Sequence, residues 1–176
     1  EIIWEKGTNR AEFFRGEVNK YGWVDTGSSF LPSEIVAAFL WAQLENIDRI
    51  QDRRKAIWNA YFAALQDKSA EGLFELPKLP GFATNNAHMF YLVFPDLAKR
   101  SEFIAGMKAN GVMCPFHYLA LHSSEFFKSY AASHAPSARA ADFQNCNRYA
   151  DCLVRLPMYY ELDPESVIDS VRDALG

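Results

Sequence analysis

Hydrophobic residues recur at helical spacing along residues 34–66 of this 176-residue chain. The first half of the stretch, VAAFLWAQL, is apolar nearly all round, so we expect it to be buried on several sides. Charges at 48–55 indicate one solvated face in the second half. The pattern predicts a single helix of about 33 residues, hence roughly 50 Å long. Because a small domain is only about 30 Å across, we expect this helix to bridge two bodies.

The pattern differs on either side of this helix. Residues 1–31 are polar and interrupted by glycines, and no hydrophobic period persists there. Beyond the helix, short apolar runs alternate with helical patterns: strands are predicted at 74–77, 88–94 and 114–118, and helices at 97–110, 124–132, 138–154 and 164–175. We therefore predict an α+β (α/β layer) chain with three parts: a segment at 1–31, a long bridging helix at 32–66 and a small α/β domain at 67–176.

Composition and net charge exclude several classes of function. The formal charge of -4 and the pI near 5.6 argue against nucleic-acid or anionic-membrane binding. No run of 18 apolar residues predicts a transmembrane helix. The chain begins at Glu1 with neither a Met nor a signal peptide, so we expect it to be part of a longer polypeptide. Three cysteines without CxxC spacing favour a reduced, cytoplasmic setting.

The segment FHYLALH holds the strongest local candidates for chemistry. His117 and His122 lie five residues apart beside Tyr118, in a pattern that suits an anionic or hydroxylated ligand. The alternative is a packed His117 satisfied by backbone groups, with His122 on the surface. No metal site is expected, because no Cys or carboxylate lies at ligand spacing.

Two polar stretches near the N-terminus offer anion donors. Lys6, Asn9, Arg10 and Arg15 lie together in a glycine-rich run, and such groups suit a phosphate or carboxylate. The run Gly27-Ser28-Ser29 precedes the predicted helix, whose N-terminus favours an anion. Equally, these stretches are typical of a solvated loop and an ordinary helix cap. The residues alone indicate that the chain contributes groups to a binding site but does not contain a complete site by itself.

Several motifs together resemble one protein family. These are EKGTNR, FFRG, KYGWVDTGSS, AAFLWAQLE, NAHMFYLVF, FHYLALH and RLPMYYELDPE. In this order and spacing they resemble the C-terminal part of DegT/DnrJ/EryC1/StrS sugar aminotransferases, which are fold-type I pyridoxal-phosphate (PLP) enzymes. The resemblance runs from Glu1 to near Gly176. There are two departures, Pro32 for a usual Met and Ala120 for a usual Pro. The second puts the rigidity of the FHYLALH segment in doubt, though not the family.

The resemblance implies a reaction and its cofactor. Family members transfer an amino group from glutamate to a ketone of a nucleotide-linked sugar, here dTDP-4-keto-6-deoxyglucose, giving a dTDP-4-amino-4,6-dideoxy sugar. The cofactor is pyridoxal 5'-phosphate, held by a Schiff-base lysine that also moves protons. None of the lysines here matches that motif, so no catalytic residue is assigned and the chain alone is expected to be inactive.

The resemblance also assigns binding residues and partners. Ser29 matches a position that reaches the cofactor phosphate of a neighbouring subunit, which implies a homodimer. The expected substrate-binding residues are Lys6, Asn9, Arg10, His117 and Tyr118. Two alternatives remain open. One is a non-catalytic binding or regulatory relative, and the other is a PLP-dependent sugar dehydratase of the same family, in which His replaces the lysine.

Overall fold

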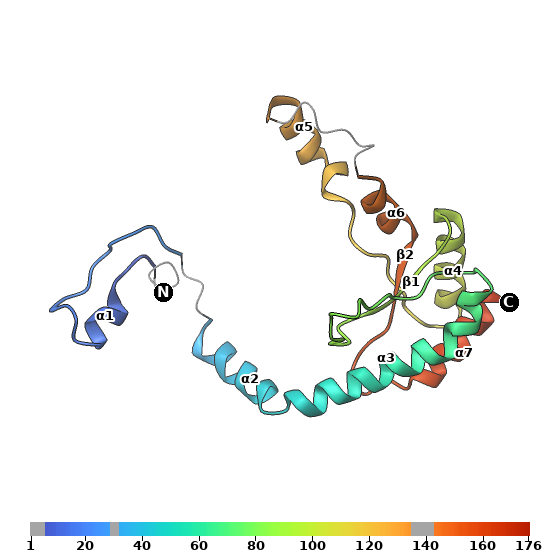
Figure 1. Ribbon diagram of the computed structural model, residues 1–176, viewed down its shortest axis with the longest axis horizontal. Helices are drawn as coiled ribbons and strands as arrows, with labels where there is room; N and C mark the ends of the chain where they lie inside the picture. The colour runs from blue at the N-terminus through green and yellow to red at the C-terminus, as the bar shows by residue number, and fades with distance from the viewer. Residues whose placement is uncertain (1–5, 29–31, 135–142) are drawn as a thin grey trace. The chain divides into compact units, whose positions relative to one another are not determined.

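A computed structural model describes residues 6–28, 32–134 and 143–176. The chain divides into two compact units, Glu1–Ile47 (unit 1) and Asp48–Gly176 (unit 2), and each is described by itself. The elements in chain order are α1 (Arg10–Phe14), α2 (Glu34–Leu44), α3 (Ile47–Ala70), β1 (Phe90–Val93), α4 (Leu97–Ala109), the 3-10 turn η1 (Leu121–Ser123), α5 (Glu125–His134), α6 (Gln144–Cys152), β2 (Leu153–Leu156) and α7 (Pro164–Leu175) (Figure 1).

Unit 2 is built on an antiparallel pair of strands. β1 and β2 pair from Phe90 opposite Leu156 to Val93 opposite Leu153. Side chains alternate along a strand, so each strand presents one face to the main core. The buried residues of that core come from both strands and from α3, α4 and α7; they include Ile57, Tyr61, Leu65, Phe90, Leu92, Phe103, Met107, Val154, Leu156, Ile168 and Val171. A smaller cluster of Val93, Cys152 and Leu153 covers the other face.

Two single residues extend this sheet at its edges. Glu75 bridges to Val93 beside β1, and Phe116 bridges to Val154 beside β2. The strands predicted at 74–77 and 114–118 are therefore wrong in length, because each contributes one bridging residue. Proline explains both limits: Pro77 and Pro115 have no N–H to donate to a ladder. The spatial order of segments is Glu75, β1, β2, Phe116.

The predicted single helix at 34–66 is wrong, because the structure has two helices there. The start is as expected, since Ser33 caps α2 through the Val36 N–H at 3.4 Å. Helix α2 ends at Leu44 and α3 runs on to Ala70. At the interruption the Asn46 side chain donates to the Ala42 carbonyl at 2.9 Å. Asn side chains compete with the helix for backbone partners in this way, which accounts for the break.

The burial expected for α2 is also wrong. None of its residues is buried, and Ile35 and Phe39 are 83% and 71% exposed. The sequence pattern is apolar all round, but no other described element covers the helix. Its apolar surface therefore has no partner among the residues that the structure describes.

Most helices of unit 2 agree with the sequence pattern, with one exception. The helices predicted at 97–110, 124–132 and 164–175 correspond to α4, α5 and α7. The helix predicted at 138–154 is wrong at its end, because β2 begins at Leu153 directly after α6. LVRL pairs with β1 as a strand and is buried at Leu153, Val154 and Leu156, but the helical pattern before it hid the change of period. No described helix combines the length and apolar content that a membrane crossing requires.

Candidate functional site

In unit 1 a close backbone crossing shapes the loop that carries the N-terminal candidates. Thr8 bridges to Trp23, the Asn9 N–H donates to the Gly22 carbonyl at 3.2 Å, and the Val24 N–H donates to the Gly7 carbonyl at 2.8 Å. These bonds join the segment before α1 to the segment that leads into α2. Backbone hydrogen bonds therefore hold this loop, although none of its described side chains is buried.

Two glycines make this crossing possible. A Cβ on Gly7 would lie 1.9 Å from the Asp25 carbonyl oxygen, and a Cβ on Gly27 would lie 2.0 Å from the Gly7 nitrogen. Both distances are impossible for a side chain, so the two positions require glycine. The same Cβ on Gly27 would lie 2.4 Å from the Lys6 carbonyl carbon. The structure thus brings the backbone of Lys6 against Gly27, next to Ser28.

The three predicted residues of this loop have different surroundings. Asn9 uses both ends of its amide: its Oδ1 accepts from the Gly22 N–H at 2.9 Å and its Nδ2 donates to Glu12 at 3.2 Å. Asn9 therefore holds the loop, and a substrate contact by it stays a prediction. Lys6 is exposed, with a positive φ of 63°.

Arg10 is exposed and lies over two aromatic rings. Its Cζ lies 5.4 Å from the Phe14 ring and 5.8 Å from the Tyr21 ring. Within the described part of the chain, neither Arg10 nor Lys6 forms an ion pair. Both cations are thus available to an anion. Ser29, the residue predicted for the cofactor phosphate, lies outside the described residues.

In unit 2, His117 and Tyr118 lie at the β2 edge of the sheet. Their rings are 4.9 Å apart, and Tyr118 is 77% exposed. The Nδ1 of the half-buried His117 is itself buried and has no hydrogen-bond partner among the described residues. A His117 satisfied by backbone groups is therefore wrong. Both residues line a hollow of about 240 Å³ together with Cys146 and Tyr149.

His122 is not the surface residue of the alternative interpretation. Its Nε2 lies 2.7 Å from the Asn147 Oδ1, and its ring stacks on Phe143 with centroids 4.4 Å apart. These contacts hold η1 against the start of α6. His122 therefore positions the segment that follows Tyr118, rather than facing a ligand freely.

Sequence reasoning missed Arg155 and Arg100, which flank this segment. The Arg155 guanidinium lies 6.0 Å from the Tyr118 ring centroid and donates to the Phe116 carbonyl at 3.2 Å. Arg100 of α4 lies 5.8 Å from the Phe116 ring centroid. The Nε atoms of both arginines are buried without partners in the described structure, as is the His117 Nδ1. The signal for Arg155 was its place inside the apolar run LVRL.

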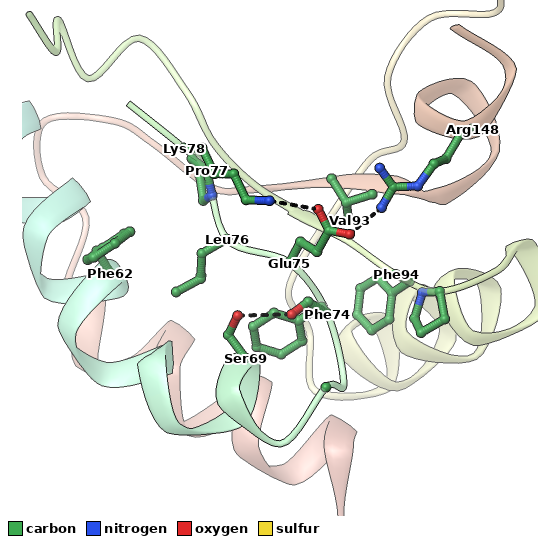
Figure 2. Close-up of a pocket in the computed structure, with 12 residues that line it drawn as sticks. Phe62, Ser69, Phe74, Glu75, Leu76, Pro77, Lys78, Val93, Phe94 and Arg148 are labelled. Carbon is green, nitrogen blue, oxygen red and sulfur yellow. Dashed lines mark hydrogen bonds and ion pairs between the residues drawn. The ribbon is translucent and has the colours of Figure 1, made fainter. Parts of the chain in front are cut away.

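A larger hollow lies at the opposite edge of the sheet, and it differs from the hollow beside Tyr118 because its cations are paired with a carboxylate. It has about 540 Å³ and lies around Glu75, between the end of α3 and β1. Figure 2 shows Arg148 and Lys78 both pointing at the Glu75 carboxylate, at 2.5 Å and 3.6 Å. Phe62, Leu76 and Phe74 form its apolar wall. Its cations already have a carboxylate, in contrast to the arginines beside Phe116 and Tyr118.

Two of the three cysteines, Cys114 and Cys152, are buried and are poor candidates for a nucleophile. Burial raises the pKa of the Cys114 thiol to about 12, and burial also raises that of Cys152. A thiol with a raised pKa is a poor nucleophile at neutral pH. Within the described ranges, no group of three His, Cys, Asp or Glu residues is placed to hold a metal ion.

The fold is a small α+β unit built on an antiparallel strand pair, and exposed cations lie in the loop of unit 1. The sequence profile of the DegT/DnrJ/EryC1/StrS aminotransferase family matches residues 4–175. The chain belongs to this family.

Solved structures agree with the fold. The S. venezuelae protein DesV gives a TM-score of 0.77 at 21% identity, covering 97% of this chain and 42% of DesV. Helicobacter pylori PseC, an aminotransferase of pseudoaminic acid biosynthesis, gives 0.74 at 16% identity, covering 99% of this chain and 43% of PseC. The PLP form of Streptococcus pneumoniae Spr1654 gives 0.76 at 16% identity, with 98% and 41% covered. The chain thus spans about two fifths of the length of the structures it matches.

Proposed function

We propose that this chain supplies the C-terminal part of a PLP-dependent nucleotide-sugar aminotransferase. The observation that carries the proposal is the family match, which extends over residues 4–175. The fold supports it, because aminotransferase structures superpose on almost the whole chain. The chain's role is to bind and orient ligands, since none of its lysines matches the Schiff-base motif.

The residues of unit 1 fit the phosphate of the cofactor. Lys6 and Arg10 are exposed cations without ion pairs in the described structure, and Lys6 lies against Gly27, one residue before Ser28. Ammonium, guanidinium and hydroxyl groups at a helix start are suitable phosphate donors. Bound pyridoxal phosphate supplies the electron sink for amino transfer. Ser29 and its neighbours would hold its phosphate, with Asn9 fixing the loop.

The residues of unit 2 fit the sugar nucleotide. His117 offers an unpartnered ring nitrogen and Tyr118 an exposed phenol, and both line a hollow beside β2. A hydroxyl-rich sugar ring suits such donors and an aromatic surface. We assign these two residues to binding and orienting the sugar.

The substrate we propose is dTDP-4-keto-6-deoxyglucose, with glutamate as the amino donor. Support comes from the motif pattern, which resembles that of the dTDP-4-amino-4,6-dideoxygalactose transaminases of this family. A homodimer would let Ser29 of one subunit reach the cofactor of the other. The residues of this chain do not decide the stereochemistry at C4, which depends on how the sugar ring is presented.

An amino-transfer assay tests the function. The polypeptide encoded by the whole reading frame that contains these 176 residues is incubated with PLP, ¹⁵N-glutamate and the 4-keto sugar. We expect ¹⁵N in a dTDP-4-amino-4,6-dideoxy sugar, detected by mass spectrometry. Deoxygenated sugar without ¹⁵N would instead indicate a dehydratase, and no turnover would favour a binding or regulatory relative.

A PLP titration tests whether the 176-residue chain by itself can form a Schiff base with the cofactor. We expect the 176-residue chain alone to give no imine absorbance and no lysine adduct after borohydride reduction, because its lysines do not match the Schiff-base motif. A stable adduct on Lys6 or another lysine of this chain, found by intact-mass measurement, would contradict that assignment.

A further inference from the structure

Arg155 differs in its partners from four other arginines of unit 2: Arg53, Arg54, Arg148 and Arg172. Arg148 and Arg172 form ion pairs with Glu75 and Asp169. Arg53 and Arg54 each donate to two or more backbone carbonyls. Arg155 has one side-chain bond, to the Phe116 carbonyl at 3.2 Å, and no carboxylate partner in the described structure. A guanidinium has five N–H donors; in Arg155 the Nε is buried without a partner and one terminal N–H serves Phe116, which leaves three terminal N–H donors without a protein partner among the described residues.

The surroundings of Arg155 hold it in place. Its backbone N–H donates to the Pro115 carbonyl at 2.9 Å, within the sheet. Its neighbours Val154 and Leu156 belong to the main core, so alternation places Arg155 on the other face of β2. Its guanidinium lies over the Tyr118 ring. A cation fixed by a strand and an aromatic ring is pre-organised, which reduces the entropic cost of binding a ligand.

A hollow lies beside Tyr118, whose ring centroid is 6.0 Å from the Arg155 guanidinium carbon. It is lined by His117, Tyr118, Cys146 and Tyr149, among others, and holds about 240 Å³. Drug-sized ligands take pockets of about 300–1,000 Å³, so this one suits a small group rather than a whole nucleotide. None of the residues that line it carries a carboxylate. An anionic group bound here against Tyr118 would face no acid of the lining, and the cation linked to this hollow through the Tyr118 ring is Arg155.

We propose that Arg155 is a further substrate-binding residue, which recognises an anionic group of the molecule bound beside His117 and Tyr118. This inference rests on the proposed function. Two sources provide such a group: the diphosphate of the nucleotide sugar and a carboxylate of glutamate. Both are flat or tetrahedral oxyanions that pair well with a guanidinium.

Binding to the 176-residue chain tests the inference without turnover. Inorganic pyrophosphate and glutarate are titrated separately, and the Nε–Hε signal of Arg155 is followed by ¹⁵N NMR. We expect one of the two probes to move that signal with saturation. Arg155→Gln should weaken the binding of this probe by about tenfold, as expected for the loss of one charge-assisted contact. Arg155→Lys, which keeps the charge, should recover part of the lost affinity.

The matched control is Arg172→Gln, which removes an exposed arginine of α7 and the same charge. It should bind both probes like the unchanged chain, and thermal melting should show that all variants fold. If neither probe moves the Arg155 signal, or if Arg155→Gln binds like Arg172→Gln, the inference is wrong.

Kinetics of the complete polypeptide then identify the source. Arg155→Gln should raise the KM for the nucleotide sugar or for glutamate, whichever supplies the anion, with kcat little changed. An unchanged KM for both substrates in an active enzyme would refute the inference alone. Absence of amino transfer by the unchanged polypeptide would refute the proposed function instead.

Discussion

The two units differ in what gives them their shape. In unit 2, buried apolar side chains from Ile57 to Val171 form a continuous core between the strands and three helices. In unit 1, Gly7 is the only buried residue among those described, and backbone bonds at the Gly7–Gly27 crossing define the loop. A segment without a core does not offset its loss of conformational entropy by itself. We therefore expect unit 2 to carry the stability and unit 1 to carry contacts for a larger assembly.

Truncation of one phenylalanine in each unit should give the largest contrast. Phe103 is 2% exposed in the core of unit 2, whereas Phe39 on α2 is 71% exposed. Phe103→Ala should lower the free energy of unfolding by about 3–5 kcal/mol, from lost burial and a cavity. Phe39→Ala should change it by less than about 0.5 kcal/mol. Urea unfolding followed by circular dichroism measures both; equal effects would contradict the contrast between the units.

Within unit 2, loss of the Arg54 side chain should have the next largest effect. Arg54 on α3 donates to the carbonyls of Ala87 at 3.0 Å, His88, and Met158 at 3.4 Å, and so ties two segments to the helix. Arg54→Ala should cost about 2–3 kcal/mol, because it leaves partly buried carbonyls without donors. Lys55→Ala, at the exposed neighbouring position, is the control and should be nearly neutral. A neutral Arg54→Ala in the same urea experiment would show that the ties do not stabilise the unit.

Within unit 1, glycine substitutions should act locally. Gly27→Ala places a methyl group 2.0 Å from the Gly7 nitrogen, so the crossing must open. Gly22→Ala is the control, because a Cβ there meets nothing within 4 Å. We expect Gly27→Ala, but not Gly22→Ala, to increase the exchange rate of the Val24 amide at least about tenfold, which corresponds to about 1.4 kcal/mol of local opening. Similar exchange in both variants would indicate that the crossing does not hold the loop.

The last effect concerns Cys114 and is the smallest at neutral pH, because it appears only at high pH. Burial raises the pKa of this thiol from 9.0 to about 12, so the unfolded chain loses the proton first. The stabilisation is complete below pH 9 and is lost as pH rises toward 12. The unfolding free energy of the unchanged chain should therefore fall more steeply over this range than that of Cys114→Ala. Cys146→Ser, at an exposed thiol, should keep the steeper slope; if both variants lose it, burial of Cys114 is not the cause.

Local sequence patterns predicted most of the helices of unit 2. They did not predict the break between α2 and α3 or the start of β2. Helices α4 and α7 have clear side-chain caps, Asp96 at 2.8 Å and Asp163 at 3.3 Å, and both starts were predictable. The break at Asn46 depends on a side chain that competes for a backbone carbonyl, which hydrophobic periodicity does not register. Strand β2 was hidden because it follows α6 without a turn.

The residues of the candidate site were predictable only in part, because some of them are brought together by contacts between distant segments. His117 and Tyr118 stand out by residue type, and the structure places them together beside a hollow. Arg155 comes from a strand 37 residues later and reaches Tyr118 only through sheet pairing with Phe116. The Gly7–Gly27 crossing is likewise a contact between distant segments. Such long-range placements follow from tertiary structure and not from local spacing.

The central claim is that the His117 segment binds the sugar nucleotide of an aminotransferase. Its most direct test compares His117→Ala with His88→Ala in the polypeptide of the whole reading frame, since His88 is an exposed histidine outside the hollow. The account predicts that His117→Ala lowers kcat/KM for the 4-keto sugar by about tenfold or more, while His88→Ala stays near the unchanged enzyme. Equal values of kcat/KM for the two variants would contradict it.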